Sequence, residues 1–210
     1  MIIGKQEEGF SPGSIKSMAI RAMLSTGKTF FPTIADIGAG RGELSRSLVN
    51  YAESIIMVDD YVPPDLPEKC KVIRNDLNEK WSIPDDSVDF LFSLEVVEHL
   101  ENPRFFFREI TRILKKGGYG FVSTPNSLNI FSRLNFLLKG CHRFFQDSCY
   151  PAHISVLAEI DFRRILAENS LEFQNFFYNY QDVMPILQIP LRVKLASLSN
   201  STGVLFRKMN

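Results

Sequence analysis

The 210-residue chain lacks several features that mark specialised classes of protein. Its three cysteines, Cys70, Cys141 and Cys149, are too few and odd in number for a disulfide framework, which predicts reduced thiols. Lys+Arg and Asp+Glu are equal at 24 each, so no net positive charge favours a nucleic-acid partner. No apolar run reaches the roughly 20 residues that span a bilayer, and the first ten residues do not resemble a signal peptide. We therefore expect a cytoplasmic protein.

The composition that is present is typical of an ordinary globular protein. Hydrophobic residues make up 45% and charged residues 23% of the chain. The length fits one domain, so we expect residues 1–210 to form a single unit. Phenylalanine is unusually frequent, with 18 residues. Two interpretations of this excess are open: packing of the core, or an aromatic wall of a substrate pocket.

Hydrophobic periodicity alternates between patterns of strands and of helices along the chain. A helix is expected over 15–23 and ended by Gly27, a second follows residue 43, a third starts at Asn102-Pro103 and stops within 115–118, and a fourth is capped by Ser155. The expected strands are 31–37, 55–58, 72–73, 88–94, 119–124, 171–180 and 203–209. This order predicts an α/β, Rossmann-like fold: a seven-stranded, mostly parallel sheet with helices on both faces.

A glycine-rich turn, Asp36-Ile37-Gly38-Ala39-Gly40-Arg41-Gly42-Glu43, lies between an expected strand and an expected helix. Its G-x-G-x-G spacing differs from the G-x-G-x-x-G of dinucleotide-binding folds. Asp36 precedes the first glycine by two residues, and a phosphate-binding turn gains nothing from an anion there. A ligand that carries an ammonium group does gain. The turn therefore favours an amino-acid-containing cofactor over NAD.

The chain resembles the class I methyltransferases, in particular the branch with ubiquinone-biosynthesis O-methyltransferases and bacterial small-molecule and glycan methyltransferases. The resembling motifs occur in family order and cover roughly residues 30–170. They are DIGAGRGE at 36–43, IIMVDD at 55–60, NDL at 75–77, FSLEVVEHLENP at 92–103 and LKKGGYGFVSTPN at 114–126. The resemblance implies S-adenosylmethionine as the cofactor and S-adenosylhomocysteine as its product.

The same resemblance implies which residues hold the cofactor. Asp36 and the backbone of Gly38, Ala39, Gly40 and Gly42 would hold its methionine part. Asp59 would accept hydrogen bonds from both ribose hydroxyls, with Asp60 as the alternative acid. The adenine would lie against Asp76 and Leu77, and the sulfonium end would face the backbone of Ser93 and Leu94.

Candidate groups for the reacting end are Glu95, Glu98, His99 and His153. Methyl transfer to a hydroxyl is helped by a nearby base, and we assign His153, Glu95 and His99 to this catalytic role. Glu95, Glu98 and His99 would share one face if the turn after residue 94 were helical. Metal-dependent branches of the family carry such an E-x-x-E-H run, so a divalent ion stays an open alternative, although we assign no metal.

Residues 127–152 form an insert that is rich in leucine and phenylalanine. Three interpretations are open: a helix packed on the core, a lid over the acceptor, or, together with 183–198, a surface that touches a membrane. We take the insert as a substrate-covering element and residues 1–30 as a helical cover at the N-terminus. Membrane contact is not the favoured interpretation.

The expected function is transfer of a methyl group to oxygen on a small molecule or glycan intermediate, with no nucleic-acid partner. The alternative is a catalytically silent module that binds S-adenosylmethionine and acts through protein partners. A nicotinamide oxidoreductase is a further rival, against which the glycine spacing and Asp36 argue. The sequence does not define an oligomeric state.

Overall fold

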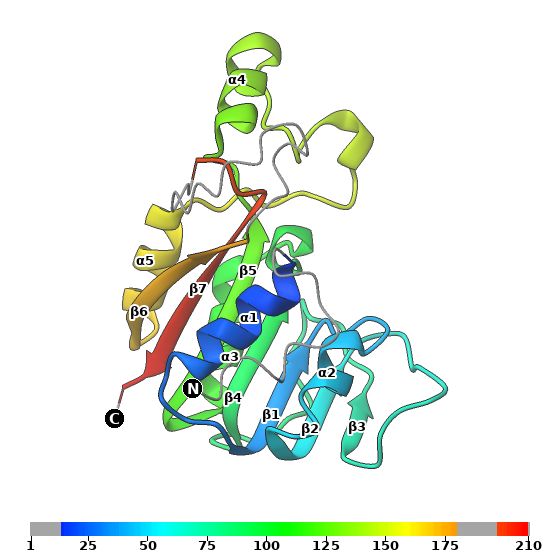
Figure 1. Cartoon of the computed structure of the whole chain (residues 1–210). Helices are drawn as coiled ribbons and strands as arrows, with labels where there is room; N and C mark the ends of the chain where they lie inside the picture. The colour runs from blue at the N-terminus through cyan, green and yellow to red at the C-terminus, as the bar shows by residue number, and fades with distance from the viewer. Residues whose placement is uncertain (1–13, 180–196, 210) are drawn as a thin grey trace, which may run out of the picture.

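The computed structural model describes residues 14–179 and 197–209, which include a single seven-stranded sheet in the order β3-β2-β1-β4-β5-β7-β6 (Figure 1). The strands are β1 (Phe31–Ile37), β2 (Ala52–Val58), β3 (Cys70–Ile73), β4 (Val88–Leu94), β5 (Leu114–Pro125), β6 (Leu171–Tyr178) and β7 (Ser201–Lys208). The first five strands pair in parallel, whereas β7 runs antiparallel to both β5 and β6. The predicted α/β, mostly parallel sheet is confirmed.

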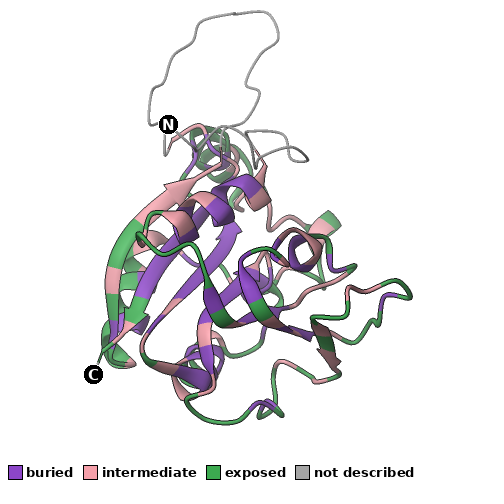
Figure 2. Ribbon diagram, turned by 60° about the horizontal axis from the view of Figure 1, so that its bottom comes forward, coloured by how far each residue is buried: buried purple, intermediate pink, exposed green. Residues whose placement is uncertain are grey.

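Helices cover both faces of this sheet (Figure 1). One face carries α1 (Ile15–Leu24) and the short α2 (Glu43–Ser47), and the other carries α3 (Pro103–Ile113) and α5 (Glu159–Glu168). Each face has its own hydrophobic cluster, and Figure 2 shows the buried residues concentrated in the sheet and on the inner side of the helices. Eight of the 18 phenylalanines are buried in these clusters, so core packing accounts for much of the excess.

Helix α3 begins as predicted but ends earlier. The Asn102 side chain accepts a hydrogen bond from the Phe105 N–H at 3.0 Å, and Pro103 occupies the first turn. The helix stops at Ile113, and β5 starts directly with Leu114 paired to Val88. The expectation of helix into 115–118 was wrong, because pairing with β4 draws these residues into an irregular start of β5.

Two further elements differ from the sequence-based expectation. Ser155 does not cap α5: its hydroxyl donates to the Leu100 carbonyl at 2.6 Å, and the helix begins instead after Ala158, whose N–H donates to Asp161 at 3.0 Å. The insert at 127–152 contains a regular helix, α4 (Ile130–Lys139), which Asn129 caps. Short 3-10 turns, η1 (Val97–His99) and η2 (Asp147–Cys149), complete the described elements.

Some predicted segments lie outside the described residues. These are positions 1–13 of the N-terminal cover and most of the apolar stretch 183–198. Among the helices of the described ranges, none combines the length and the apolar character needed to cross a bilayer.

Candidate cofactor and acceptor site

The glycine turn lies at the carboxyl end of β1, next to the point where the strand order reverses between β1 and β4. Open α/β sheets bind ligands at this position. Gly38 has φ +73°, and a Cβ added there would lie 2.3 Å from Cγ2 of Val96, so only glycine fits. The Gly38 N–H donates to the Val58 carbonyl at 2.8 Å, which ties the turn to the end of β2.

Asp36 is the buried acid of this turn. Its carboxylate accepts a hydrogen bond from the Ser45 hydroxyl at 2.6 Å. Burial raises the pKa of Asp36 to about 6, and the neighbouring charge of Asp59 adds to the rise, against the hydrogen bond from Ser45. A buried carboxyl with no cation bound to it is therefore costly to ionise, and an ammonium group of a ligand would stabilise its charged form.

A cavity of about 230 Å³ opens beside Asp36. Its lining combines the glycine turn with the end of β4 and with α1: Lys16, Asp36, Gly38, Ala39, Arg41, Glu43, Leu44 and Leu94. Lys16 on α1 forms an ion pair with Glu43 at the start of α2. The N-terminal helix thus contributes a side chain to the cavity. This contribution was not predicted, because α1 carries no motif.

Asp59 lies at the end of β2 and faces the glycine turn. Its carboxylate accepts hydrogen bonds from the Gly40 N–H at 2.7 Å and from the Tyr61 N–H at 3.0 Å. Asp60, in contrast, is exposed. A second cavity of about 620 Å³ adjoins this region, lined by Gly40, Arg41, Glu43, Arg46, Tyr61, Pro63 and Pro64. Of Asp59 and Asp60, Asp59 is the acid that contacts the glycine turn. Its role in binding the ribose stays a prediction.

Asp76 follows β3 and is exposed. Its carboxylate accepts from the Asn78 N–H at 2.8 Å, and Leu77 packs on the hydrophobic core. The Asp59 N–H donates to the Ile73 carbonyl at 3.3 Å, so the ends of β2 and β3 share one edge of the sheet. Within the described residues no contact joins Asp76 to Asp36 or Asp59. Its predicted contact with adenine remains a prediction.

Ser93 and Leu94 end β4 with different surroundings. Leu94 lines the cavity beside Asp36, as expected for a residue near the sulfonium end. The Ser93 side chain is fully buried, and its hydroxyl has no hydrogen-bond partner in the described structure. The predicted role of Ser93 rests on its backbone and does not need this hydroxyl.

Glu95 adopts a left-handed backbone conformation with φ +55°, which is rare for a residue other than glycine. Its carboxylate accepts hydrogen bonds from the hydroxyls of Ser123, at 2.7 Å, and Ser201, at 3.2 Å. The helical turn that would place Glu95, Glu98 and His99 on one face is absent, because the 3-10 turn covers only Val97–His99. Glu95 therefore lies beside the carboxyl end of β5 and the first residue of β7.

Glu98 is grouped with two histidines instead. One ligand atom from each of Glu98, His99 and His153 lies within 4.8 Å of the other two. The loop that carries His153 is fixed to η1, since the N–H groups of Ile154 and Ser155 donate to the Glu98 carbonyl at 2.9 and 3.0 Å. The structure thus brings residues 98–99 and 153 together, as the sequence-based hypothesis required.

Both imidazoles of this group are oriented by the backbone. Nδ1 of His99 lies 2.7 Å from the Ala152 carbonyl, and Nδ1 of His153 lies 2.7 Å from the Phe144 carbonyl. A carbonyl only accepts, so each Nδ1 carries the hydrogen and Nε2 of the neutral ring is left with its lone pair. That arrangement suits a proton acceptor, and it equally suits a metal ligand.

The carboxyl groups of Glu95 and Glu98 are both buried. Burial raises the pKa of both Glu95 and Glu98 above the ordinary range of glutamate, and the charge of Glu95 adds to the rise at Glu98. Glu98 Oε2 accepts a hydrogen bond from the Thr124 hydroxyl at 3.1 Å, whereas Oε1 has no hydrogen-bond partner in the described structure. Acids with perturbed pKa values are typical of functional sites.

The seven-stranded sheet, with the glycine turn at the carboxyl end of β1, has the fold of the class I methyltransferases. Residues 35–122 match the family model described as Methyltransferase domain. The family implies S-adenosylmethionine as the cofactor.

Two curated relatives agree with this class. The ubiquinone biosynthesis O-methyltransferase of Pelagibacter ubique is 27% identical over 100 residues, which cover 44% of this chain and 42% of that protein. The 2-methyl-6-phytyl-1,4-hydroquinone methyltransferase of Synechocystis is 29% identical over 137 residues, which cover 59% of this chain and 42% of that protein. The chain thus spans about two fifths of the length of these relatives.

Solved structures share the whole fold. The S-adenosylmethionine-dependent methyltransferase from Mesorhizobium loti superposes with a TM-score of 0.62 at 19% identity, covering 93% of this chain and 98% of that one. The likeness therefore extends beyond the residues that the family model matches and includes the antiparallel end of the sheet.

Proposed function

We propose that this chain is an S-adenosylmethionine-dependent methyltransferase that methylates a hydroxyl group of a small molecule or glycan intermediate. The observation that supports it most directly is Asp36, a buried acid with a raised pKa that lines a cavity beside the glycine turn. Such a site fits the ammonium group of the cofactor. We propose that the enzyme works in the cytoplasm, where its three free thiols stay reduced.

One set of residues would hold the cofactor, and another would accept the proton of the acceptor hydroxyl. S-adenosylmethionine supplies a methyl group that is already activated on its sulfonium. Asp36 and the glycine-turn backbone would hold the methionine part, and Leu94 would bound the space next to it. The protein then has to align the acceptor hydroxyl and take up its proton.

His153 is the proposed proton acceptor. Its Nε2 is free of the backbone bond that fixes Nδ1, and it lies in the same group as His99 and Glu98. The acceptor hydroxyl would transfer its proton to Nε2, and the neighbouring carboxyl would stabilise the imidazolium that forms. His99 is the second imidazole whose Nδ1 is held by a backbone carbonyl, and its ring stands nearly perpendicular to that of His153. Glu95 would act through its charge on Glu98.

A metal-assisted version of the same reaction has its own support. Glu98, His99 and His153 offer one oxygen and two nitrogen atoms within 4.8 Å, a donor set that suits a divalent transition metal. Excess EDTA applied to an active preparation separates the two versions. Full activity in EDTA would exclude the metal, whereas loss of activity that Mn²⁺ or Zn²⁺ restores would support it.

Cofactor binding is tested by calorimetry with S-adenosylhomocysteine and with NAD. We expect binding of the first and none of the second, and the opposite result would overturn the proposal. Asp36→Ala should weaken binding of S-adenosylhomocysteine severely. Glu53→Ala is the control, because Glu53 is an exposed acid of β2, the strand next to β1, and should leave affinity unchanged.

Turnover distinguishes an enzyme from a silent binding module. Formation of S-adenosylhomocysteine should be measured with aromatic and sugar hydroxyl compounds and with their amine counterparts. We expect turnover with hydroxyl compounds that falls at least about a hundredfold in His153→Ala, the range for loss of a general base. Tight cofactor binding without turnover on any acceptor would favour the silent module.

A further inference from the structure

Helix α4 stands apart from the body of the protein (Figure 1). It begins at Ile130, only five residues after the end of β5, and rises beyond the carboxyl edge of the sheet. The cofactor cavity and the Glu98, His99 and His153 group lie at this same edge. A partner that binds α4 would therefore lie beyond the same edge of the sheet as the site.

An ordinary surface helix buries its apolar side, whereas α4 turns polar side chains inward. Its single buried residue is Ser132, whose hydroxyl lies 3.3 Å from Nδ1 of His142 and accepts from the Arg143 N–H. Asn135 also points inward and donates to the Cys141 carbonyl at 2.8 Å. The polar side chains of the helix thus hold it to the loop that follows.

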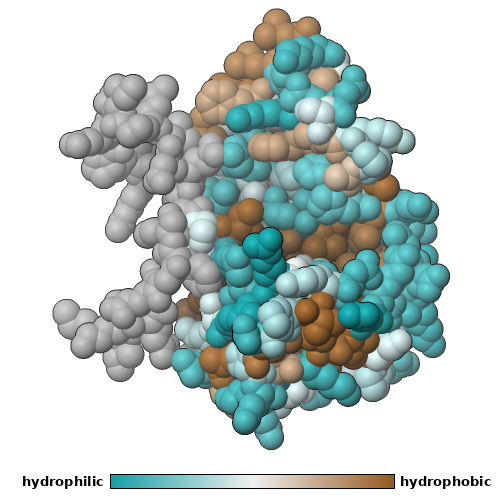
Figure 3. All heavy atoms as spheres, turned by 90° about the vertical axis from the view of Figure 1, so that its right-hand side faces the viewer, coloured by the Kyte–Doolittle hydropathy of each residue, from teal (hydrophilic) through white to brown (hydrophobic). Residues whose placement is uncertain are grey.

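Apolar side chains occupy the outer side of α4. Leu137 is 79% and Leu138 82% exposed, the highest values among the large hydrophobic residues described. Four more apolar residues of the helix are partly exposed around them: Ile130, Phe131, Leu134 and Phe136. Figure 3 shows hydrophobic residues gathered at the tip of the molecule, where α4 lies. A contiguous exposed patch of this kind marks an interaction surface.

The charges around this patch have one sign. Arg133, Lys139 and Arg143 are exposed, and no acidic residue occurs in the sequence from Ile110 to Gln146. In the described structure no ion pair joins these three cations to an acid. The chain as a whole is neutral, so the excess of positive charge is local to α4.

We propose that α4 docks on the surface of an anionic lipid bilayer, with Leu134, Leu137 and Leu138 inserted among the acyl chains and the cations at the headgroups. A helix with an apolar side bordered by basic residues lies in the plane of the interface in this way. Ten residues are far too few to cross the bilayer. Docking would turn the acceptor side of the site toward the membrane. The docking proposal does not depend on methyl transfer.

Vesicle co-sedimentation of the full chain tests this proposal. We expect binding to vesicles of phosphatidylcholine mixed with phosphatidylglycerol, weaker binding to phosphatidylcholine alone, and weakening by salt. Leu137→Ser with Leu138→Ser should lower the vesicle affinity about tenfold or more. Both side chains are exposed, so an unchanged thermal midpoint will show that the variant is folded.

Two further variants make the result specific. Ile160→Ser is the matched control, since Ile160 is a 51% exposed apolar residue on α5, and it should leave vesicle binding unchanged. Arg133→Gln with Lys139→Gln should remove the preference for the anionic vesicles. No binding to either kind of vesicle, or equal binding by the leucine variant, would overturn the proposal. A dimer of the wild-type protein would also overturn it, if the leucine variant were monomeric and neither protein bound vesicles. The patch would then be an interface between two copies of the chain.

Discussion

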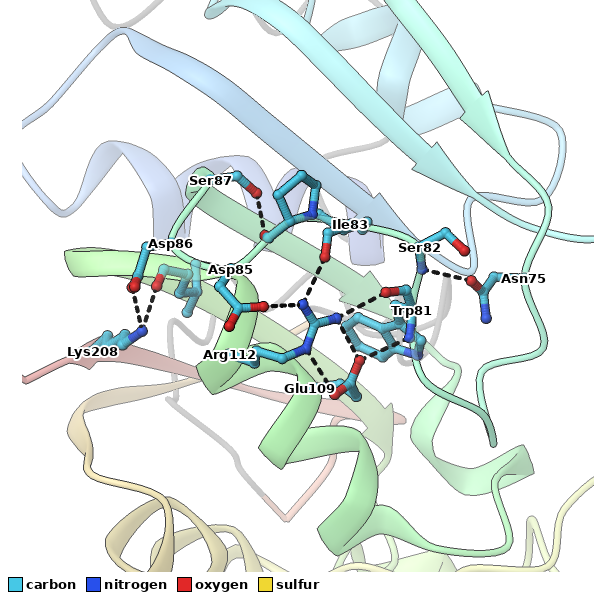
Figure 4. A network of polar contacts seen from close by, with 12 residues as sticks. Asn75, Trp81, Ser82, Ile83, Asp85, Asp86, Ser87, Glu109, Arg112 and Lys208 are labelled. Atoms are coloured by element: carbon cyan, nitrogen blue, oxygen red, sulfur yellow. Dashed lines mark hydrogen bonds and ion pairs between the residues drawn. The ribbon is translucent and has the colours of Figure 1, made fainter.

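Two clusters of polar groups sit at opposite ends of β4 and differ in how completely they are paired. At the start of the strand, the Arg112 guanidinium donates to both carboxylate oxygens of Glu109, to Asp85, and to the carbonyls of Trp81 and Ile83 (Figure 4). At the other end, Ser93, Glu98 and Thr202 each have a buried side-chain oxygen without a hydrogen-bond partner in the described structure.

The two clusters also shift their acids in opposite directions. Burial, the largest influence, raises the pKa of Glu109, but the hydrogen bonds from Arg112 and the Trp81 N–H outweigh it and bring that pKa below the ordinary value. At Glu98 burial is the largest influence as well, and no cation opposes it. The paired cluster stabilises the fold. The unpaired cluster lowers stability, and its unsatisfied polar groups are typical of a ligand-binding site.

The largest effect should follow from breaking the paired cluster. Arg112→Met leaves the Glu109 carboxylate buried without its cation, so we expect a loss of about 3 kcal/mol in the free energy of unfolding. Urea denaturation measures it. Arg104→Met is the control, because its ion pair with Glu168 is exposed and should contribute far less to stability than the buried pair. Equal losses in the two variants would contradict the contrast between the clusters.

The unpaired cluster should respond in the opposite sense. Glu98→Gln removes a carboxyl group that is costly to ionise, so stability should stay the same or rise, while turnover should fall about a hundredfold. Glu109→Gln, the same change in the paired cluster, should lower stability and leave the turnover of the folded protein unchanged. Denaturation and formation of S-adenosylhomocysteine, measured on both variants, decide between these outcomes. A stability loss in Glu98→Gln as large as that in Glu109→Gln would show that Glu98 is structural.

The difference between the clusters also separates what the sequence predicted from what it did not. Strands such as 31–37 and 88–94 were found with their observed bounds, because continuous apolar runs between turn residues are local signals. The glycine turn and Asp36 were also predicted from a local signal, the spacing of the glycines and the acid that precedes them. The early end of α3 was missed, since pairing of Leu114 with Val88 is a contact between distant residues.

The site was predicted less completely than the fold. Glu98, His99 and His153 were named from the sequence, but their exact grouping depends on a 3-10 turn and on the loop bond from Ile154 to Glu98. Glu95 was expected to share a helical face with Glu98 and His99, and its carboxylate instead accepts hydrogen bonds from the hydroxyls of Ser123 and Ser201. Its left-handed backbone conformation has no signature in sequence, because glutamate rarely adopts it.

The smallest predicted effect concerns Asp36, an acid that shares the raised pKa of the unpaired cluster and faces the cofactor cavity. Its pKa of about 6 lies above the value in an unfolded chain, so the ligand-free protein should lose stability as pH rises from about 4 to about 6. Affinity for S-adenosylhomocysteine should change in the opposite direction, because its ammonium group needs the ionised acid. We expect binding about tenfold weaker at about pH 5 than at neutral pH.

Calorimetry across this range measures the affinity, and Asp36→Asn should flatten the pH profiles of both binding and stability. Glu53→Gln, at an exposed acid of β2, should preserve both profiles. If affinity were independent of pH in the wild-type protein, Asp36 would not contact the ammonium group. Asp36 would then be a structural acid like Glu109, with the Ser45 hydroxyl as its hydrogen-bond donor. The contrast between paired and unpaired clusters would no longer indicate where the cofactor binds.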